Sequence, residues 1–406
     1  MVDFIVLDIT QLIFNKLCFK DKIIFMATHK YNSNNTIINS IPFDTNLDIL
    51  CQKKFANCIK LNTKIIYNIY FLTNLTSLTV EKYSPDINKL TNLTYLDLNK
   101  NNNICSISNL TNLQYLYAGP NNIIQNDIEK LSKLTHLNIS NNDKITNICH
   151  LTALQHLEIA GIDFKNRNML VSLTNLTHLN IGDIRENFEI CHLTNITYLD
   201  ISSSCIKQQQ IDIMTQLTGL KLSNNFCIRD VGNLIKLKYL DISKVNHVIQ
   251  NINSLSNLRY LNALGNKYIK DISGLTKLKY LNASCYDSFD GESDISCGIT
   301  IESLRNLDLL WLDISFSNFN DLNILTSLQS LKIHGCKSIN RNSISSLKNL
   351  THLDYHRSFN QLYCKPGLQL ETMDKYFSTV NNLYCSDLVN LFSDELCAKK
   401  YRAQFI

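Results

Sequence analysis

The 406-residue sequence has little excess charge of either sign, since its formal net charge is +4 and its pI is near 8.3. Without clustered Lys and Arg it lacks the usual basis of phosphate binding, so we do not expect nucleic acid as a partner. No apolar run is long enough to span a membrane. The first residues carry Asp3 and Asp8 and have neither a basic leader nor a small-residue cleavage site. These absences predict a cytoplasmic, intracellular protein with no membrane partner.

The sequence also lacks the motifs of familiar catalytic chemistry. No nucleophile stands in a recognisable pattern with a base, and there is no glycine-rich phosphate loop or paired-carboxylate motif. We therefore predict no catalytic residues, no cofactor and a non-enzymatic protein. The scarcity of Gly (11) and Pro (4), beside heavy use of Asn, Ile and Lys, is typical of AT-rich genomes, such as those of large DNA viruses of amoebae or of slime moulds.

One phrase recurs along most of the chain. It reads LTNLTYLDLNKN from Leu90, LSKLTHLNISNN from Leu131, LTNITYLDISSS from Leu193 and LIKLKYLDISKV from Leu234. Its third apolar position, which we call the anchor, returns almost always after 18 to 22 residues, and this period indicates a solenoid of stacked repeats. The anchors are Leu78, Leu96, Leu116, Leu137, Leu157, Leu179, Leu199, Leu220, Leu240, Leu261, Leu281, Leu312, Leu331 and Leu353.

The pattern L-x-x-L-x-x-L-x-L/I-x-x-N resembles the leucine-rich repeat family. In THLNIS, Leu137 and Ile139 lie two residues apart, so both point to one side of an extended segment. The resemblance implies an α/β repeat solenoid, a horseshoe with a parallel β-sheet on its concave face. Because most repeats have only 20 to 22 residues, we expect short 3₁₀ or extended segments on the convex side and not full α-helices.

Asparagine recurs five residues after the anchor, where the chain leaves the strand. A buried amide at this place can satisfy backbone groups that the parallel strands leave open, so stacked copies would form a ladder. The ladder residues are Asn101, Asn121, Asn142, Asn225 and Asn266, and Ser204, Val245, Ser317, Cys336 and Ser358 hold the same place in other repeats.

Fourteen cysteines invite a disulfide interpretation. Many of them, such as Cys105, Cys149 and Cys191, fall where the repeats place small apolar residues. We predict reduced core thiols in an intracellular protein. The histidines that follow two of them, His150 and His192, are interpreted as part of the framework.

Two columns of residues flank the anchors and are predicted to face solvent. The residue before the anchor is usually aromatic or histidine, and the residue after it is often acidic or an amide. Aromatic side chains are enriched in binding hot spots, so the columns predict a protein-binding face. Strand propensity and repeat duplication are the alternative origin of such columns. The partner-binding candidates are Tyr95, Tyr115, His136, His156, His178, Tyr198, Tyr239, Tyr260, Tyr280 and Trp311 before the anchors, with Asp97, Glu158, Asp200, Asp241 and Asp313 after them.

Three of these candidates are histidines in consecutive repeats. His136, His156 and His178 would stack at strand spacing, which suits a metal or a pH-sensitive patch. No thiolate or carboxylate accompanies them at a fixed spacing, so we predict no metal site.

Residues 1–45 form an N-terminal segment, of which residues 1 to about 31 are predicted to be helical. Their phrase resembles a degenerate F-box, the helical motif that docks an adaptor onto the Skp1 subunit of cullin-RING ubiquitin ligases. Matching features are Asp8, the Ile13-Phe14 pair and Leu17, whereas Val6 stands where the family usually has proline and no tryptophan closes the motif. The alternative is a plain helical cap over the first repeat. The adaptor-docking residues that the resemblance implies are Leu12, Ile13, Phe14, Leu17 and Ile23.

Residues 46–358 hold about fifteen repeats, including a cryptic first one anchored at Ile59. The regular spacing fails once, at residues 285–298, where an acidic and turn-rich insertion is predicted to form an extruded loop and a candidate contact. Nearby, the WLDIS phrase favours Leu312 as the anchor over a register shifted by one step. Residues 359–406 have apolar positions at helical intervals and are predicted to form a C-terminal cap.

These features predict a protein-recognition module, the substrate-binding adaptor of a Skp1-cullin-F-box type ubiquitin ligase. A target protein would bind the concave face and a Skp1-like adaptor would bind the N-terminus. The alternative is a plain leucine-rich repeat scaffold or effector that binds a host or self protein without recruiting a ligase.

Overall fold

The computed structural model describes residues 60–65, 73–83, 87–99, 101, 106–162, 169–184, 189–285, 298–336, 338–340 and 342–354. The chain divides into two compact units, Met1–Asn195 and Ile196–Ile406, which we describe separately. The predicted F-box-like segment and the predicted C-terminal cap lie outside the described residues, and so do the adaptor-docking candidates.

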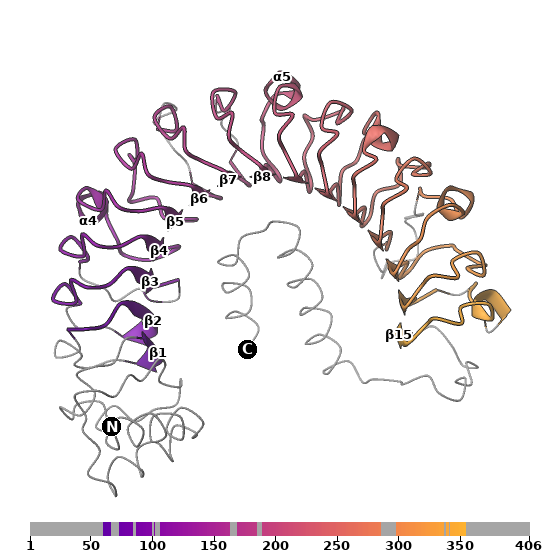
Figure 1. Ribbon diagram of the computed structural model, residues 1–406, viewed down its shortest axis with the longest axis horizontal. Coiled ribbons are helices and arrows are strands. Elements are labelled where there is room, and N and C mark those ends of the chain that lie inside the picture. Colours follow the sequence, from indigo (N-terminus) through magenta and orange to yellow (C-terminus); the bar gives the residue numbers. More distant parts are fainter. Residues whose placement is uncertain are drawn as a thin grey trace, which may run out of the picture. The chain divides into compact units, whose positions relative to one another are not determined.

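Each unit is a stack of coils that contributes one short strand per repeat (Figure 1). The first unit contains β1 (Lys60–Ile65), β2 (Ser77–Tyr83), β3 (Tyr95–Asp97), β4 (Tyr115–Tyr117), α4 (Gln125–Ile128), β5 (His136–Asn138), β6 (His156–Glu158) and β7 (His178–Asn180). The second contains β8 (Tyr198–Asp200), α5 (Gln208–Asp212), β9 (Gly219–Lys221), β10 (Tyr239–Asp241), η3 (Ile252–Ser254), β11 (Tyr260–Asn262), β12 (Tyr280–Asn282), η4 (Glu302–Leu304), β13 (Trp311–Asp313), β14 (Ser330–Lys332), η5 (Asn342–Ile344) and β15 (His352–Asp354).

Within each unit the strands pair in chain order and in parallel, with the anchors in register. Leu137 pairs with Leu157 in the first unit, and Leu240 pairs with Leu261 in the second. The anchor Leu312 pairs with Leu281 on one side and Leu331 on the other, which confirms the register that the WLDIS phrase favours. The parallel sheet predicted from the repeat pattern is therefore confirmed.

The first strand corrects one prediction. In β1 the partner of the anchor Leu78 is Leu61, so Leu61 takes the anchor position in place of Ile59. The two residues are separated by two positions, and alternation along a strand cannot distinguish them because both would point to the same side. The register of the neighbouring strand decides between them.

The core of each coil consists of the leucines and isoleucines of the repeat phrase. In the repeat of β5, Leu131, Leu134 and Ile139 have 0% of their surface exposed and Leu137 has 2%. Four such side chains per coil stack on those of the neighbouring coils, and this shared burial is the main source of stability in a solenoid.

The predicted asparagine ladder is present. Asn142, 1% exposed, donates from Nδ2 to the carbonyl oxygens of Ala118 (3.4 Å) and Ile123 (3.2 Å), and its Oδ1 accepts from the backbone N–H of Lys144 (3.0 Å). Asn225 bonds the preceding repeat in the same way. Where serine replaces asparagine, Ser204 donates from its hydroxyl to the carbonyl of Ile201 at 2.8 Å.

The residue just before the ladder position adopts a left-handed backbone conformation, four residues after the anchor. Asn141, Gly161 and Ser203 have φ values of 60°, 69° and 53°. Their backbone N–H groups donate to carbonyl oxygens of the next coil. The N–H of Gly161, for instance, donates to the carbonyl of Gly182 at 3.0 Å. This conformation is easiest for glycine and asparagine, which explains why these residues recur there.

In the described repeats, the side of each coil opposite the strands carries only short helical segments (Figure 1). The helices α4 and α5 have 4 and 5 residues, and η3, η4 and η5 have 3 residues each. The prediction of short segments in place of full helices is confirmed. The insertion does not interrupt the strand order, because β12 pairs directly with β13 across it.

The cysteine prediction needs correction. Cys149 and Cys191 are exposed, although Cys285 and Cys336 are buried as expected. Each of these two exposed thiols follows a fully buried isoleucine, Ile148 or Ile190, and in an extended turn the next side chain points to the opposite side. All six described cysteines are free thiols.

Candidate functional site

The candidate site is the surface that we call the sheet face, formed by the first and third residues of the short strands. Because the central anchor of each strand points into the core, its two neighbours point away from it. Backbone pairing places equivalent residues side by side, as with His136 and His156 or Tyr239 and Tyr260. Each column therefore brings together residues about 20 positions apart in sequence, at roughly 4.8 Å between neighbouring strands.

In the first unit the column before the anchors forms a continuous run of rings. The ring centroids of Tyr95 and Tyr115 are 6.2 Å apart, and those of Tyr115 and His136 are 4.3 Å apart. His136 and His156 stack at 4.1 Å, and His156 and His178 at 4.0 Å. The run thus crosses five strands, β3 to β7, and its rings are half-buried. The stacking of the three histidines predicted from the sequence is confirmed.

Neighbouring hydroxyl groups fix two of these histidines. Thr135 Oγ1 lies 2.9 Å from His136 Nδ1, and Thr177 Oγ1 lies 2.8 Å from His178 Nδ1. The same threonine hydroxyls lie 3.2 Å from carbonyl oxygens of the preceding repeat. Since the threonine is fixed to the backbone, it sets the orientation of the imidazole plane and favours the stacked arrangement.

Tyr95 opens the run with a perturbed hydroxyl. Burial, and then the nearby charge of Asp97, raise the pKa of Tyr95 well above its ordinary value. The phenol therefore stays protonated and keeps its hydrogen-bond donor across the physiological pH range.

In the second unit the same column is less continuous. Gly219 interrupts it, so Tyr198 and Tyr239 lie 6.5 Å apart, whereas Tyr239 and Tyr260 stack at 4.7 Å. Tyr239, Tyr260 and Trp311 have 6%, 7% and 5% of their surface exposed. The prediction that the whole column faces solvent is wrong for these three rings, since Tyr239 and Tyr260 stack on each other and Lys332 lies over Trp311. Tyr280 is half-buried.

Lysines lie over two of the rings in this column of the second unit. Lys221 Nζ is 5.9 Å from the ring centroid of Tyr198, and Lys332 Nζ is 5.9 Å from that of Trp311. This separation is within the range of a cation–π attraction. Lys221 is also 3.7 Å from a carboxylate oxygen of Asp200.

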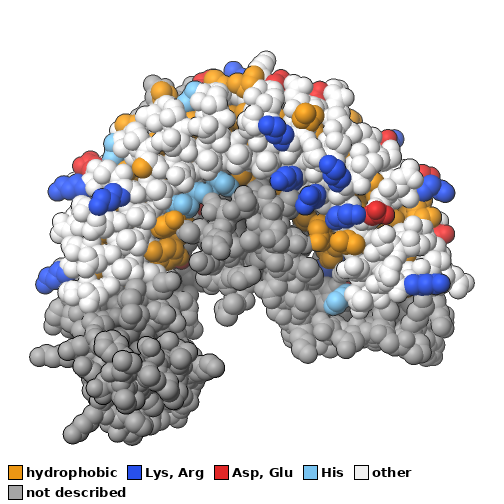
Figure 2. Space-filling view, in the orientation of Figure 1, with side chains coloured by type: hydrophobic (Ala, Val, Ile, Leu, Met, Phe, Trp, Pro, Cys, Tyr) orange, Lys and Arg blue, Asp and Glu red, His pale blue; other side chains and the backbone are white. Residues whose placement is uncertain are grey.

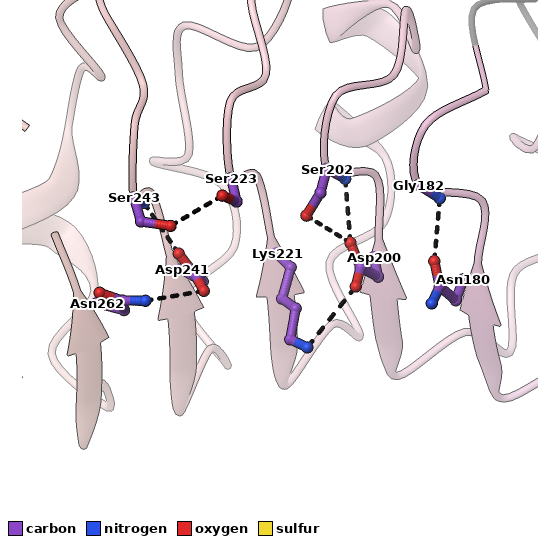
Figure 3. A network of polar contacts seen from close by, with 9 residues as sticks. All are labelled: Asn180, Gly182, Asp200, Ser202, Lys221, Ser223, Asp241, Ser243 and Asn262. Carbon is purple, nitrogen blue, oxygen red and sulfur yellow. Dashed lines mark hydrogen bonds and ion pairs between the residues drawn. The ribbon is translucent and has the colours of Figure 1, made fainter. Parts of the chain in front are cut away.

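The column after the anchors has a structural role that sequence reasoning missed. Asp200 Oδ1 accepts from the backbone N–H of Ser202 (3.0 Å) and from its hydroxyl (2.6 Å), and Asp241 Oδ1 accepts from the N–H of Ser243 at 2.9 Å (Figure 3). Side chains of Asp and Asn close turns in this way. The available signal was the recurring segment Asp-Ile-Ser, which Asn-Ile-Ser and Asn-Ala-Ser each replace once. The same bond is made by Asp97, Asn138, Asn180, Asn262, Asn282 and Asp313.

Lateral bonds connect neighbours within this column. Asn262 Nδ2 donates to Asp241 Oδ2 at 3.0 Å (Figure 3), and Asn138 Nδ2 donates to Glu158 Oε2 at 2.7 Å. Most acidic candidates are therefore turn-closing residues, and Asp200 and Asp241 are only 9% and 8% exposed. This structural role explains the acidic column without a ligand.

Two histidines outside the columns, His150 and His192, were predicted to belong to the framework. The imidazoles of His150 and His192 lie 3.3 and 3.1 Å from carbonyl oxygens of the preceding repeat, which agrees with their interpretation as framework. Among the described residues, no group of three His, Cys, Asp or Glu side chains is placed to hold a metal ion. The described part of the chain also contains no helix with the length and apolar character of a membrane span.

Comparison with solved structures identifies the fold. A leucine-rich repeat protein of Leptospira interrogans, LIC12759, superposes with a TM-score of 0.54 at 24% sequence identity, over 73% of this chain and 82% of that one. The fold is that of a leucine-rich repeat protein. Two Listeria monocytogenes internalins, InlF and InlJ, align at 25% and 21% identity with TM-scores of 0.44 and 0.45. These alignments cover 70% and 79% of this chain, and 83% and 73% of theirs. No protein-family model matches the sequence, and no curated protein matches it either.

Proposed function

We propose that this leucine-rich repeat chain is a protein-recognition module whose sheet face binds a partner protein. The observation that carries the proposal is the run of rings from Tyr95 to His178, held at centroid distances between 4.0 and 6.2 Å. Rigid aromatic groups in a row offer much contact area at low entropic cost, as binding hot spots do.

The scaffold itself does not require rings in this column. Gly219 and Ser330 occupy the same place in β9 and β14, and both strands keep the register of their neighbours. In the column after the anchors, in contrast, the Asp and Asn side chains close turns within their own repeats. This difference favours a binding role for the rings over strand propensity and repeat duplication.

Site-specific photo-crosslinking in cells tests the face directly. A benzoylphenylalanine would replace His136 on the sheet face or, as a matched control, Glu129 beside α4 on the opposite side of a coil. We expect one recurrent protein adduct from position 136 and none from position 129. Equal adducts from both positions, or none from either, would contradict recognition through the sheet face.

We further propose that the N-terminal segment recruits a Skp1-type adaptor, which would make the chain the substrate-binding subunit of a ubiquitin ligase in the cytoplasm. The support is the sequence resemblance of residues 1–45 to an F-box, carried by Asp8, the Ile13-Phe14 pair and Leu17. The free thiols of all six described cysteines support the cytoplasmic location, where disulfides are rare.

A pull-down with a purified Skp1-type adaptor tests this second proposal. The variant Ile13→Asp, Leu17→Asp places two charges on the predicted docking side, where burying an unpaired carboxylate is costly. The control Gln11→Asp, Asn15→Asp places the same charges on the opposite side of the predicted helix. We expect binding by the wild type and the control, and loss in the variant, with circular dichroism showing that all three are folded. Absence of wild-type binding would leave a plain scaffold or effector.

A further inference from the structure

The edge at which the chain enters the strands of the second unit carries a group of cations. Lys238, Arg259 and Lys279 lie two residues before the anchors of β10, β11 and β12. Lys236 and Lys277 lie four residues before the anchors of β10 and β12. We call these five residues the basic row. Lys236, Arg259 and Lys277 are exposed, and Lys238 and Lys279 are half-buried.

Backbone hydrogen bonds place the central members of the row side by side. The N–H of Arg259 donates to the carbonyl of Lys238 at 2.8 Å, and the N–H of Lys279 donates to the carbonyl of Arg259 at 3.0 Å. Three like charges thus follow one another at strand spacing, roughly 4.8 Å at the backbone. Like charges on directly opposite residues of neighbouring strands are destabilising, so the row has a cost for the isolated chain.

The row also departs from what the framework uses at these positions. Elsewhere a threonine two residues before the anchor lies within hydrogen-bond distance of a carbonyl of the preceding repeat, as Thr135 and Thr218 do at 3.2 Å. An asparagine four residues before the anchor donates to the preceding repeat, as Asn112 does to the carbonyl of Thr91 at 2.9 Å. In the repeats of β10, β11 and β12 a basic residue takes the threonine position, and in those of β10 and β12 a lysine also takes the asparagine position, which Asn257 keeps in the repeat of β11.

Little in the described part of the chain neutralises the row. Lys279 Nζ lies 3.7 Å from Asp308 Oδ2, but the side chain of Asp308 is 75% exposed. Lys236 and Lys277 donate to the neutral amides of Gln216 (2.6 Å) and Asn257 (2.8 Å). Among the described carboxylates, none forms an ion pair with Lys238 or Arg259.

The sequence around the basic row also contains more basic than acidic residues. Residues 215–285 contain ten Lys and Arg against three Asp and Glu, an excess of seven positive charges where the whole chain has +4. Figure 2 shows several Lys and Arg side chains gathered on one face, next to hydrophobic side chains. The net charge of residues 215–285 is therefore more positive than that of the whole chain.

We propose that the basic row binds an acidic segment, rich in Asp and Glu, of a protein held by the sheet face of the second unit. This assignment rests on the proposed recognition function and specifies the chemistry of the partner. Single-stranded nucleic acid fits less well, because its bases require exposed rings for stacking, and the adjacent Tyr239 and Tyr260 are 6% and 7% exposed. Four of the five cations are lysines, which lack the bidentate geometry that favours arginine for phosphate.

Fluorescence anisotropy with the full chain tests the proposal. The probes are a labelled peptide of alternating Glu and Ser, its Gln counterpart, and a single-stranded oligothymidine of equal charge. The row variant is Lys238→Gln, Arg259→Gln, Lys277→Gln. The control, Arg229→Gln, Lys267→Gln, Lys270→Gln, removes the same charge from exposed residues that follow, and do not precede, the strands β9 and β11.

We expect the row variant to bind the Glu peptide about tenfold more weakly, as three exposed ion pairs would give, and the control to stay within about twofold of wild type. Wild-type binding should weaken as salt shortens the Debye length to about 8 Å. Equal losses in both variants would refute a specific site. Tighter binding of oligothymidine than of the Glu peptide would replace the acidic segment with nucleic acid.

The two proposals fail separately. Crosslinking at His136 reports a partner on the first unit's sheet face whether or not the row binds the peptide. A recurrent adduct at His136 together with an unaffected row variant would retain protein recognition and overturn the basic row alone.

Discussion

The repeats of β5 to β7 and those of β10 to β12 have the same framework but different surfaces. In the first set, stacked imidazoles lie beside a neutral edge of Thr135, Gln155 and Thr177. In the second set, tyrosines lie beside Lys238 and Arg259. The anchors pair in the same register in both sets. The repeat phrase therefore specifies the coil, and the positions around the strand are available for recognition.

Replacing an anchor leucine should have the largest effect on stability. The effect should be similar in both sets, because their anchors are equally buried. Leu157 is 1% exposed and Leu261 is 0% exposed. We expect Leu157→Ala and Leu261→Ala each to lower the free energy of unfolding by about 2–5 kcal/mol, through lost burial and the cavity left behind. Chemical denaturation followed by circular dichroism measures both. A cost below about 1 kcal/mol for either variant would show that the two frameworks are not equivalent.

Each set contains one residue of the asparagine ladder. Asn142 bonds three backbone groups in the first set and Asn266 does so in the second, whereas Val245, 1% exposed, holds the equivalent place in the repeat of β10. Asn142→Val should cost about 2–3 kcal/mol, since buried backbone groups lose their partners. The control Asn175→Val removes an exposed bond to the carbonyl of Thr152 and should cost less than about 1 kcal/mol. Similar costs for both variants would deny the ladder a special role.

Much of this framework could be predicted from the sequence, because periodic apolar residues report directly on burial. The anchors from Leu78 onward, the ladder and the short outer segments follow from that periodicity. Single positions were harder. Ile59 and Leu61 differ only in register, and Cys149 follows a buried isoleucine but points outward.

The candidate site was less predictable than the framework. The ring column follows from the position before the anchor, but its burial at Tyr239 and Trp311 depends on packing between elements. The turn-closing role of Asp200 needs the geometry of the next two residues. The basic row was missed because a net charge of +4 averages over the whole chain. Reading charge at one repeat position at a time would have found it.

Introducing the charges of the basic row into the repeats of β5 to β7 tests whether these charges alone account for the difference between the two surfaces. Thr135→Lys, Gln155→Arg, Thr177→Lys would give the neutral edge the charges of the second set. When these substitutions are combined with those of the row variant, we expect the affinity for the Glu peptide to be about tenfold higher than that of the row variant alone. This gain is equivalent to about 1.4 kcal/mol. The neutral variant Thr135→Gln, Thr177→Gln has side chains of similar polarity without charge and should gain nothing. A gain in the neutral variant would mean that lost threonine bonds, and not the charges, change binding.

The smallest effect concerns the left-handed residue four positions after the anchor. Gly161 holds this place in the repeat of β6, whereas Ser203 holds it in that of β8 with φ 53°. Ser203→Gly removes the Cβ that makes this conformation costly, although the unfolded chain gains entropy, so we expect a stabilisation of less than about 1 kcal/mol. Ser203→Ala retains the Cβ and should give no stabilisation. Thermal denaturation of the two variants measures the difference, and a destabilised Ser203→Gly would show that the lost hydroxyl and the added unfolded-chain entropy together outweigh the relief of backbone strain.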